Sequence, residues 1–487
     1  MMRYQLRHSP VLVTPRSRPV GPAVPVCQYR TSCTHQKKNR GYPHPISAAR
    51  PVRVSTGAHD RAVLVRPGDE GGDPGLRRVT QQVRLRELVR RLLRADGVIA
   101  ARLRDAGLCD ADDISLDQLH LLPTVSKQDL WDHYPFGFQV DDRIVCVHGS
   151  SGTGGRPTLI PYTANDVHVW AEVMARALGG AGVTRHSTVH NAYGYGLFTG
   201  GLGVHHGGLR LGARVIPLSG GMTDRQVRLV ADLRPDVLCC TPSYAIHLGE
   251  ALRAANVESS FRVGLFGAEP WTDAMRDKIE ELLGVRALDI YGLSEVIGPG
   301  VACESLDSGG MLNVAEDHFL VEAVDENGLP VPDGTPGELV FTTLTKTGMP
   351  LLRYRSGDVA VLAGPAPDSA RTLRRMGKPL GRRDDMLVVR GVNVFPSEVE
   401  AVVLADGRVS PHYLVVDDRR NPARPELRVV VESAHDVADD LRTALRERLG
   451  LTCAVHVVAH GAVPRSETGK ARRLARWSAG QPPVPGL

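Results

Sequence analysis

Eight consecutive residues, from Ser150 to Pro157, bring together three glycines, three hydroxyl side chains and one guanidinium. Glycines let the backbone approach an anion closely, so that successive N–H groups can converge on it. The hydroxyls can donate further hydrogen bonds, and a guanidinium is suited to phosphate oxygens. We therefore predict a phosphate-binding loop made by Ser150, Ser151, Gly152, Thr153, Gly154, Gly155 and Arg156.

The sequence around this loop excludes a Walker A motif, because that motif ends in Gly-Lys-Ser/Thr and opens a helix. Here an apolar run at 143–147 precedes the loop, and Leu159 to Tyr162 follow it. This pattern favours a strand, a loop and a second strand. A flexible Ser/Gly turn without a ligand is the alternative that the local sequence leaves open.

A second group of residues could bind an aromatic ring. Tyr193, Tyr195 and Phe198 lie within six positions and beside several glycines, although aromatic residues make up only 5% of the chain. Aromatic side chains next to glycines are typical of a flat slot for an aryl group. Packing of the same three side chains in the core is the competing interpretation.

The elements that must position these residues follow a regular order. Strand-like and helix-like segments alternate between residues 187 and 290, which predicts open and largely parallel α/β layers with ligand loops at the strand ends. The expected strands are 187–191, 215–218, 236–241, 263–266 and 287–290, and the expected helices are 200–211, 224–233, 244–255 and 273–283. Beyond residue 340 the strands look shorter and antiparallel, and a compact α+β module follows a boundary near Gly381.

The first 80 residues differ in composition from the rest. They hold 14 Arg and Lys against 4 Asp and Glu, whereas the whole chain has a net charge of +5. This segment is rich in Pro and Arg and lacks a helical or strand period, so we expect a disordered tail. Charges without interleaved aromatic residues argue against a nucleic-acid arm. We expect that removing residues 1–78 leaves the kinetics unchanged.

Apolar runs, the N-terminal sequence and the cysteines indicate the cellular compartment of the protein. No apolar run approaches the length of a membrane span, and nothing at the start resembles a secretory signal. Eight cysteines without a C-x-x-C pair indicate reduced thiols and argue against a structural zinc site. These features predict a cytoplasmic protein that does not act on a membrane.

Four further motifs resemble the phenylacetate-coenzyme A ligases of the adenylate-forming (acyl-CoA synthetase) superfamily. They are 191–203, Gly267-Ala268-Glu269-Pro270-Trp271, Tyr291-Gly292-Leu293-Ser294-Glu295 and 390–396. With the Gly-rich loop they stand in the family's order, and the resemblance extends from about residue 81 to about residue 476.

The resemblance implies a large α/β N-terminal domain with layered sheets and a smaller, mobile α+β C-terminal domain. The expected division is a tail at 1–80, an ATP- and acyl-binding AMP-binding domain at 81–380, a hinge at 381–385, a lid domain at 386–476 and a frayed end at 477–487.

The resemblance also implies a two-step reaction. An aryl carboxylic acid attacks the α-phosphorus of ATP and releases pyrophosphate, and coenzyme A then displaces AMP from the acyl adenylate. Glu295 corresponds to the Mg²⁺ ligand, a hard carboxylate beside the leaving phosphates. Tyr291 and Gly292 correspond to the residues at the adenine face, and Gly267, Ala268 and Glu269 to its wall. Gly154 and Arg156 depart from the usual Thr and Lys of the loop, so the tightness of ATP binding is an open question.

The remaining roles come from matches at the C-terminal motifs. Asp358 corresponds to the carboxylate that accepts both ribose hydroxyls, and Arg382 to an arginine that reaches the nucleotide. Asp384 stands at the hinge position. Lys470 corresponds to the mobile lysine that stabilises the charge of the adenylation transition state. Gly391 lies where the pantetheine arm of coenzyme A would pass.

Several alternatives stay open. A stand-alone enzyme that loads an aryl acid onto a carrier protein would share every adenylation residue, and a noncatalytic relative would explain the altered loop. The sequence does not identify the aromatic acid, decide between catabolism and biosynthesis of aromatic acids, or settle whether the protein is a homodimer.

Overall fold

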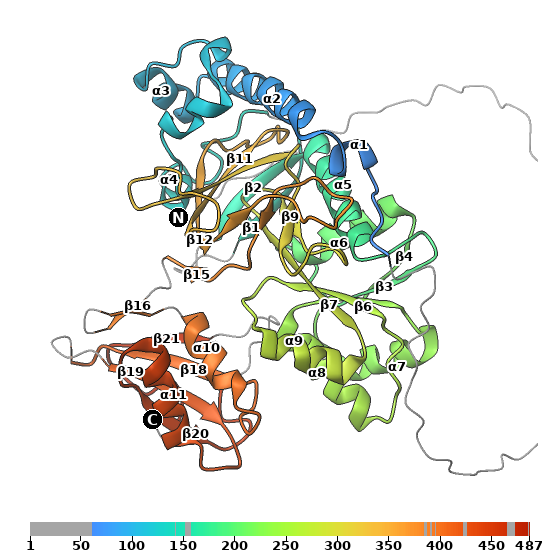
Figure 1. The fold of residues 1–487 in the computed structure, drawn as a ribbon, viewed down its shortest axis with the longest axis vertical. Coiled ribbons are helices and arrows are strands. Elements are labelled where there is room, and N and C mark those ends of the chain that lie inside the picture. The colour runs from blue at the N-terminus through green and yellow to red at the C-terminus, as the bar shows by residue number, and fades with distance from the viewer. Residues whose placement is uncertain are drawn as a thin grey trace, which may run out of the picture. The chain divides into compact units, whose positions relative to one another are not determined.

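The computed structural model describes residues 61–141, 143–150, 157–383, 387–389, 392–394, 396–421, 426–464, 473–485 and 487. Figure 1 shows the elements in chain order. They form a helical N-terminal segment, a large α/β part with three sheets, and a small α+β part. This mixed α/β architecture confirms the fold class expected from the sequence.

The helical N-terminal segment is built around one long amphipathic helix, α2. Asp73 caps its start by accepting a hydrogen bond from the Leu76 N–H. Leu85, Leu88, Val89 and Leu92 recur at helical spacing and are buried. The elements of this segment are α1 Pro67–Glu70, α2 Pro74–Ala95, α3 Val98–Asp105, the 3₁₀ helices η1 Ala111–Asp113 and η2 Leu116–Leu121, and α4 Lys127–Asp132.

A nine-stranded sheet organises the large part. Its order is β13-β14-β9-β8-β7-β6-β5-β3-β4; the strands from β4 to β7 run parallel and those from β7 to β13 antiparallel. Its strands are β3 Thr188–Asn191, β4 Arg214–Pro217, β5 Val237–Cys240, β6 Val263–Gly267, β7 Arg286–Leu293, β8 Gly298–Cys303, β9 Leu312–Val314, β13 Leu362–Ala363 and β14 Arg375–Met376. The alternation expected from the sequence between residues 187 and 290 is confirmed.

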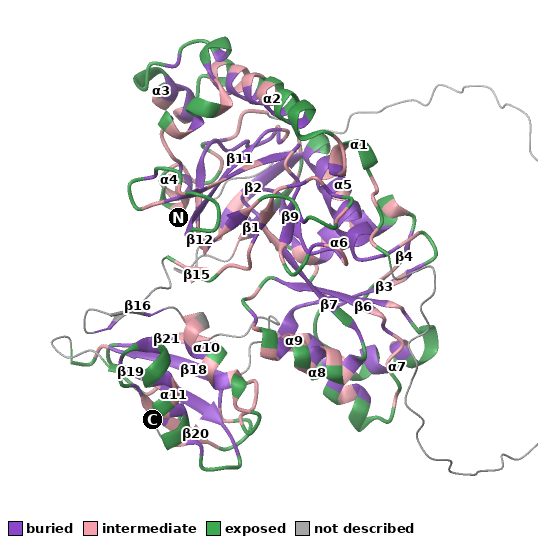
Figure 2. Cartoon of the chain, in the orientation of Figure 1, coloured by how far each residue is buried: buried purple, intermediate pink, exposed green. Residues whose placement is uncertain are grey.

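Helices cover both faces of this sheet (Figure 1). Along β5, Val237 and Cys239 belong to the core under α5 and α6, whereas Leu238 and Cys240 belong to the core under α7, α8 and α9. Such continuous burial is typical of parallel strands with helices on both sides, and the sheet is correspondingly buried in Figure 2. The helices are α5 Ala164–Gly180, α6 Gly200–Leu211, α7 Thr223–Leu233, α8 Pro242–Ala254 and α9 Asp273–Leu283.

Two smaller sheets complete the large part. β1 Ile144–Ser150 and β2 Thr158–Thr163 form an antiparallel pair. The other sheet has the order β10-β11-β12-β15, with β10 Phe319–Val324, β11 Gly337–Thr343, β12 Tyr354–Ala360 and β15 Gly381–Arg382.

The small part has its own core, made by β18, β19, α10 and α11 around Tyr413, Val415 and Val429. Its four-stranded sheet has the order β20-β19-β18-β21, and β21 lies parallel to β18. The elements are β16 Leu387–Val389, β17 Val392–Val394, α10 Pro396–Ala405, β18 Tyr413–Asp418, β19 Glu426–Glu432, α11 Ala438–Leu449, β20 Ala454–Val458 and β21 Leu474–Trp477. These elements make up the compact α+β module that the sequence predicts beyond Gly381.

The structure differs from the sequence expectation at both ends of the described chain. The disordered tail was expected to reach residue 80, but α1 and α2 begin at Pro67 and Pro74. Polar contacts rather than apolar periodicity hold this stretch: the Val63 N–H donates to the Gly179 carbonyl at 2.9 Å, and Glu70 lies 3.2 Å from Arg371. At the other end, a frayed segment was expected from residue 477, but Val484 is fully buried beside Trp477.

None of the helices in the described ranges combines the length and the apolar character that crossing a membrane requires.

Candidate functional site

The Gly-rich loop connects two paired strands, as the sequence predicts. The last residue pair of β1 and β2 is Ser150 with Thr158. Between them, Ser151, Gly152, Thr153, Gly154, Gly155 and Arg156 lie outside the described residues. The described part of the predicted phosphate loop is therefore its stem, which ends at Ser150.

Ser150 connects this stem to Glu295. The Ser150 hydroxyl donates to Glu295 Oε1 at 2.6 Å, and the Glu295 side chain is buried in the turn between β7 and β8. The structure thus brings together two residues that are 145 positions apart and that the sequence had assigned to one site.

Sequence reasoning missed a cation at the same place. The Lys127 ammonium lies 3.3 Å from Glu295 Oε1 and donates to the Ser150 hydroxyl at 3.2 Å. Lys127 opens α4, which is fixed by a reciprocal capping box between Ser126 and Asp129. Nothing in the local sequence indicated that Lys127 would lie beside Glu295.

A second missed cation, Lys346, lies behind Glu295. Its ammonium donates to the Glu295 main-chain carbonyl at 2.7 Å, and the residue is 1% exposed. Burial lowers the pKa of Lys346 to about 8, against the opposing effect of Asp166 and Glu295. The Tyr162 hydroxyl donates to the preceding carbonyl, that of Ser294, at 3.0 Å.

Tyr291, Asp358 and Arg382 form the second predicted constellation. The Tyr291 hydroxyl donates to Asp358 Oδ2 at 2.6 Å, and Arg382 Nη1 lies 3.4 Å from Asp358 Oδ1. Burial and the neighbouring Asp358 raise the pKa of Tyr291 well above its ordinary value. The Tyr291 ring stacks on Phe341, with centroids 5.9 Å apart. The carboxylate of Asp358 therefore lies between the Tyr291 hydroxyl and the Arg382 guanidinium.

The glycine motifs lie beside this constellation at the carboxyl ends of two parallel strands. Gly267 ends β6 and pairs with Ile290 on β7, where a Cβ would come within 2.2 Å of the Ile290 carbonyl oxygen. A Cβ on Gly292 would come within 1.8 Å of the Gly298 carbonyl oxygen. Only glycine fits at such close backbone approaches. Ala268 follows with a φ of 69°, and the Glu269 carboxylate accepts the Ser243 N–H at 2.7 Å.

The three aromatic residues of the predicted ring slot have different environments. Tyr193 is 5% exposed, belongs to the main core and donates its hydroxyl to the Leu265 carbonyl at 3.3 Å. Its position matches the core-packing interpretation. Tyr195 is half-buried and accepts a hydrogen bond from Asn191 at 2.7 Å, and Phe198 is 45% exposed.

Three predicted site residues, Asp384, Gly391 and Lys470, lie outside the described residues. Their roles remain predictions.

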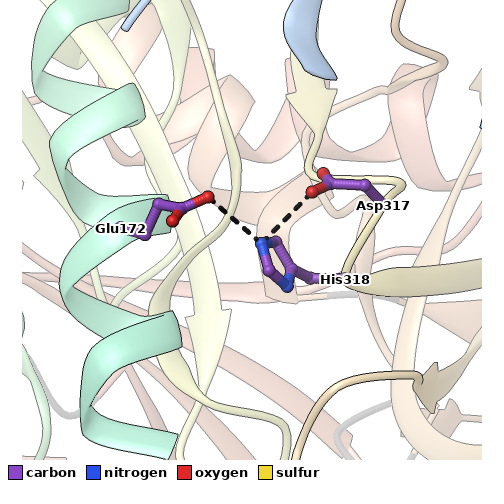
Figure 3. A group of neighbouring side chains, drawn as sticks. All are labelled: Glu172, Asp317 and His318. Carbon is purple, nitrogen blue, oxygen red and sulfur yellow. Dashed lines mark ion pairs between the residues drawn. The ribbon is translucent and has the colours of Figure 1, made fainter. Parts of the chain in front are cut away.

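Figure 3 shows another group of buried charged side chains, Glu172 on α5 and Asp317 and His318 directly before β10. His318 Nε2 lies 3.5 Å from Glu172 and 3.2 Å from Asp317. A metal ion could bind such a donor set, but Arg176 already fills this role: its Nη1 donates to Asp317 at 2.7 Å and its Nη2 pairs with Glu172. We interpret the group as a structural ion network between α5 and the start of β10.

Comparison with known proteins places these motifs in context. The AMP-binding enzyme family matches residues 90–345, and the AMP-binding enzyme C-terminal domain matches residues 391–476. A phenylacetate-coenzyme A ligase of Thermus thermophilus is 47% identical over 82% of this chain and 96% of its own length.

Solved structures of a coenzyme A ligase resemble the fold of this chain. A 2-hydroxyisobutyryl-CoA ligase in its postadenylation state, in complex with R3-HIB-AMP, has a TM-score of 0.78 at 27% identity, over 84% of this chain and 91% of its own. The same enzyme in complex with 2-HIB-AMP and CoA in the thioesterification state has a TM-score of 0.63, with the same identity and coverage.

Proposed function

Because the chain belongs to the phenylacetate-coenzyme A ligase family of AMP-binding enzymes, we propose that it activates an aryl carboxylic acid with ATP and transfers it to coenzyme A. In the first step a carboxylate oxygen bonds to the α-phosphorus and the bond to pyrophosphate breaks. In the second, the sulfur of coenzyme A bonds to the acyl carbon and AMP leaves. Phenylacetate and related aromatic acids are the substrate class, and their catabolism is the pathway context that we infer.

The observation that carries this proposal is the hydrogen bond of 2.6 Å between Ser150 and Glu295. It joins Ser150, at the stem of the Gly-rich loop, to the Glu295 carboxylate, which follows β7. An anionic triphosphate at the loop would meet Lys127 there as well, a cation that neutralises charge on the leaving pyrophosphate.

Mg²⁺ fits the donor set at this place. The Glu295 carboxylate and the Ser150 hydroxyl are hard oxygen donors of the kind that Mg²⁺ prefers, and they stand next to the phosphate loop. When bound with ATP, the ion would supply charge neutralisation for the departing phosphates. Glu295 is the residue that we assign as its protein ligand.

We assign the ribose to Asp358 and the adenine to the ends of β6 and β7. The Asp358 carboxylate lies beside Tyr291 and Arg382, and two hydrogen bonds from ribose hydroxyls to it would orient the α-phosphate for attack. Gly267, Ala268 and Glu269 are assigned as the wall of the adenine site, and Tyr291 and Gly292 as the residues at its face. The acyl ring is assigned to the surface near Tyr195 and Phe198, where Phe198 is exposed.

The second half-reaction requires movement of the small domain about Asp384, so that Lys470 withdraws and the segment at Gly391 takes its place. The neighbouring 2-hydroxyisobutyryl-CoA ligase, solved in a postadenylation and a thioesterification state, supports this division. The reaction needs ATP and coenzyme A, and the absence of a C-x-x-C pair among the eight cysteines of the sequence favours reduced thiols. We therefore propose a cytoplasmic enzyme.

The test is pyrophosphate release with ATP, Mg²⁺ and a panel of aryl acids, with coenzyme A and an acyl-carrier protein compared as acceptors. We expect acid-dependent pyrophosphate release and a thioester with coenzyme A. Glu295→Gln and Asp358→Asn should lose most of the pyrophosphate release. Asp117→Asn, the same kind of change at an exposed residue distant in sequence from both, is the matched control and should keep it. A thioester with the carrier protein alone would establish the alternative acceptor, and no release with any acid would refute the proposal.

A further inference from the structure

Lys346 is a buried cation that the proposed reaction does not use. It lies between β11 and β12, and its ammonium is placed 4.9 Å from the centroid of the Tyr162 ring and 2.7 Å from the Glu295 main-chain oxygen. Removing an ammonium from water is costly, and an apolar side chain of similar length would avoid that cost. A role in core packing alone therefore does not account for a lysine at this position.

The backbone around Lys346 is held without help from its side chain. The Asp166 carboxylate accepts the N–H groups of Thr347 and Gly348 at 2.6 and 2.9 Å. Arg91 donates to the Lys346 carbonyl at 3.0 Å from the other side. The Lys346 ammonium therefore reaches the Glu295 carbonyl from a loop whose backbone is held by other contacts.

Two side chains, those of Tyr162 and Lys346, donate hydrogen bonds to main-chain carbonyls of the turn that carries Glu295. Tyr162 binds the Ser294 carbonyl at 3.0 Å and Lys346 binds the Glu295 carbonyl. With both carbonyls fixed, the Glu295 side chain extends toward Ser150, where its carboxylate accepts the hydroxyl. Lys127 contacts that carboxylate directly, so the two lysines act on different parts of the same residue.

We propose that Lys346 is a positioning residue that aligns Glu295 for binding of the Mg²⁺–ATP complex, by fixing the Glu295 peptide from within the core. This inference rests on the proposed function of Glu295. It predicts that loss of the ammonium weakens the metal-dependent part of ATP binding and leaves binding of the aryl acid unchanged.

The experiment uses Lys346→Met, which keeps the length of the side chain, and Lys346→Gln, which keeps a neutral donor. Two quantities are measured: the Mg²⁺ concentration that half-saturates pyrophosphate release, and the calorimetric affinity for α,β-methylene-ATP with and without Mg²⁺. One hydrogen bond from a charged donor corresponds to a change of about tenfold or more. We expect an increase of that size in half-saturating Mg²⁺ for Lys346→Met, a smaller one for Lys346→Gln, and an equal loss of Mg²⁺-dependent analogue affinity.

Lys278→Met is the matched control, because it removes an exposed ammonium on α9 that pairs with Glu281 and does not touch Glu295 or the Lys346 loop. Its Mg²⁺ dependence should equal that of the wild type. The melting temperature distinguishes a positioning role of Lys346 from a purely structural one. If Lys346 were purely structural, its variants would have a lower melting temperature and a higher KM for the aryl acid, and that result would overturn the proposal. If Lys346→Met does not fold, Lys346→Gln decides the question.

Glu295→Gln distinguishes failure of this inference from failure of the proposed function. If Glu295→Gln loses Mg²⁺ dependence while both Lys346 variants keep the wild-type value, Lys346 is not a positioning residue. If Glu295→Gln keeps normal Mg²⁺ dependence, the assignment of Glu295 itself is wrong and the inference fails with it.

Discussion

The Tyr291 hydroxyl donates to the Asp358 carboxylate at 2.6 Å, which links the strand that ends the parallel part of the large sheet to a strand of a separate sheet. Both residues come from motifs that the sequence assigned to the nucleotide, and 67 positions separate them. Their contact fixes the position of the Asp358 carboxylate, which we propose as the acceptor for ribose.

Tyr291→Phe should therefore weaken ATP use. The ring can still stack on Phe341, but the donor to Asp358 is lost. We expect kcat/KM for ATP to fall about tenfold, the effect of one hydrogen bond to a charged acceptor, with no change in the KM for coenzyme A. Steady-state pyrophosphate release measures both. Asp358→Ala should in addition lose discrimination between ATP and 2′-deoxy-ATP, and retained discrimination would show that Asp358 does not bind ribose.

Truncation at the N-terminus should depend on where the chain is cut. Removing residues 1–60 should leave kinetics and stability unchanged, because the sequence there lacks a foldable pattern. Removing residues 1–78 also removes Glu70, the partner of the buried Arg371 at 3.2 Å, and Arg77, which donates to the Thr372 carbonyl at 2.8 Å.

We expect the longer truncation to lower the free energy of unfolding by about 3 kcal/mol, since the buried Arg371 keeps Asp307 but loses Glu70, one of its two carboxylate partners. The expectation from sequence concerned the kinetics after removal of residues 1–78, and it stays a prediction. Urea denaturation of the two truncated proteins measures the difference, and equal stability would show that the segment at 61–78 contributes nothing.

Much of the fold could be predicted from periodicity, and the missed features share a physical reason. The parallel strands and their helices between residues 187 and 290 alternate along the sequence because each buries an apolar face. The N-terminal segment was missed because Glu70 and Arg77 bury charged groups through ion pairs, which leave no apolar pattern. Lys127 and Lys346 were missed for a related reason: their contacts with Glu295 exist only in the folded chain.

The buried network around Glu172 should make stability depend on pH. The hydrogen bond with His318 and the charge of Arg176 hold the pKa of the Glu172 carboxyl well below its usual value near 4.5, against the effect of burial. A lowered pKa stabilises the folded state above that usual value, and this contribution is lost as the pH falls below it.

Glu172→Gln should accordingly lower the free energy of unfolding at pH 7 by about 2 kcal/mol, and the difference from the wild type should shrink below pH 4.5. Thermal or urea unfolding across this range measures it. Because Arg176 supplies the cation of the network, EDTA should not change the melting temperature of the wild type. A large decrease with EDTA would show that a metal ion binds there after all.

Lys470→Ala should separate the two half-reactions. The attacking carboxylate and the α-phosphate are both anionic, so adenylation needs a cation between them, whereas thioester formation does not. We expect pyrophosphate release to be abolished and thioester formation from supplied acyl adenylate to stay largely intact. The two assays are run on the same preparation, and equal loss of both in a folded variant would remove the proposed role.

Restricting the predicted hinge at Asp384 should impair thioester formation and spare adenylation, the reverse of the effect expected for Lys470→Ala. Proline fixes the backbone dihedral at its position, so Asp384→Pro should hold the small domain in the adenylating arrangement. Pyrophosphate release would persist and thioester formation would fall steeply. Gly391→Leu should give the same partial phenotype by another route, because its side chain would block the pantetheine arm without preventing rotation. Single-turnover assays of each half-reaction compare the two variants. Full transfer to coenzyme A in both, at normal ATP turnover, would rule out the alternation of the two domains as the mechanism of this chain.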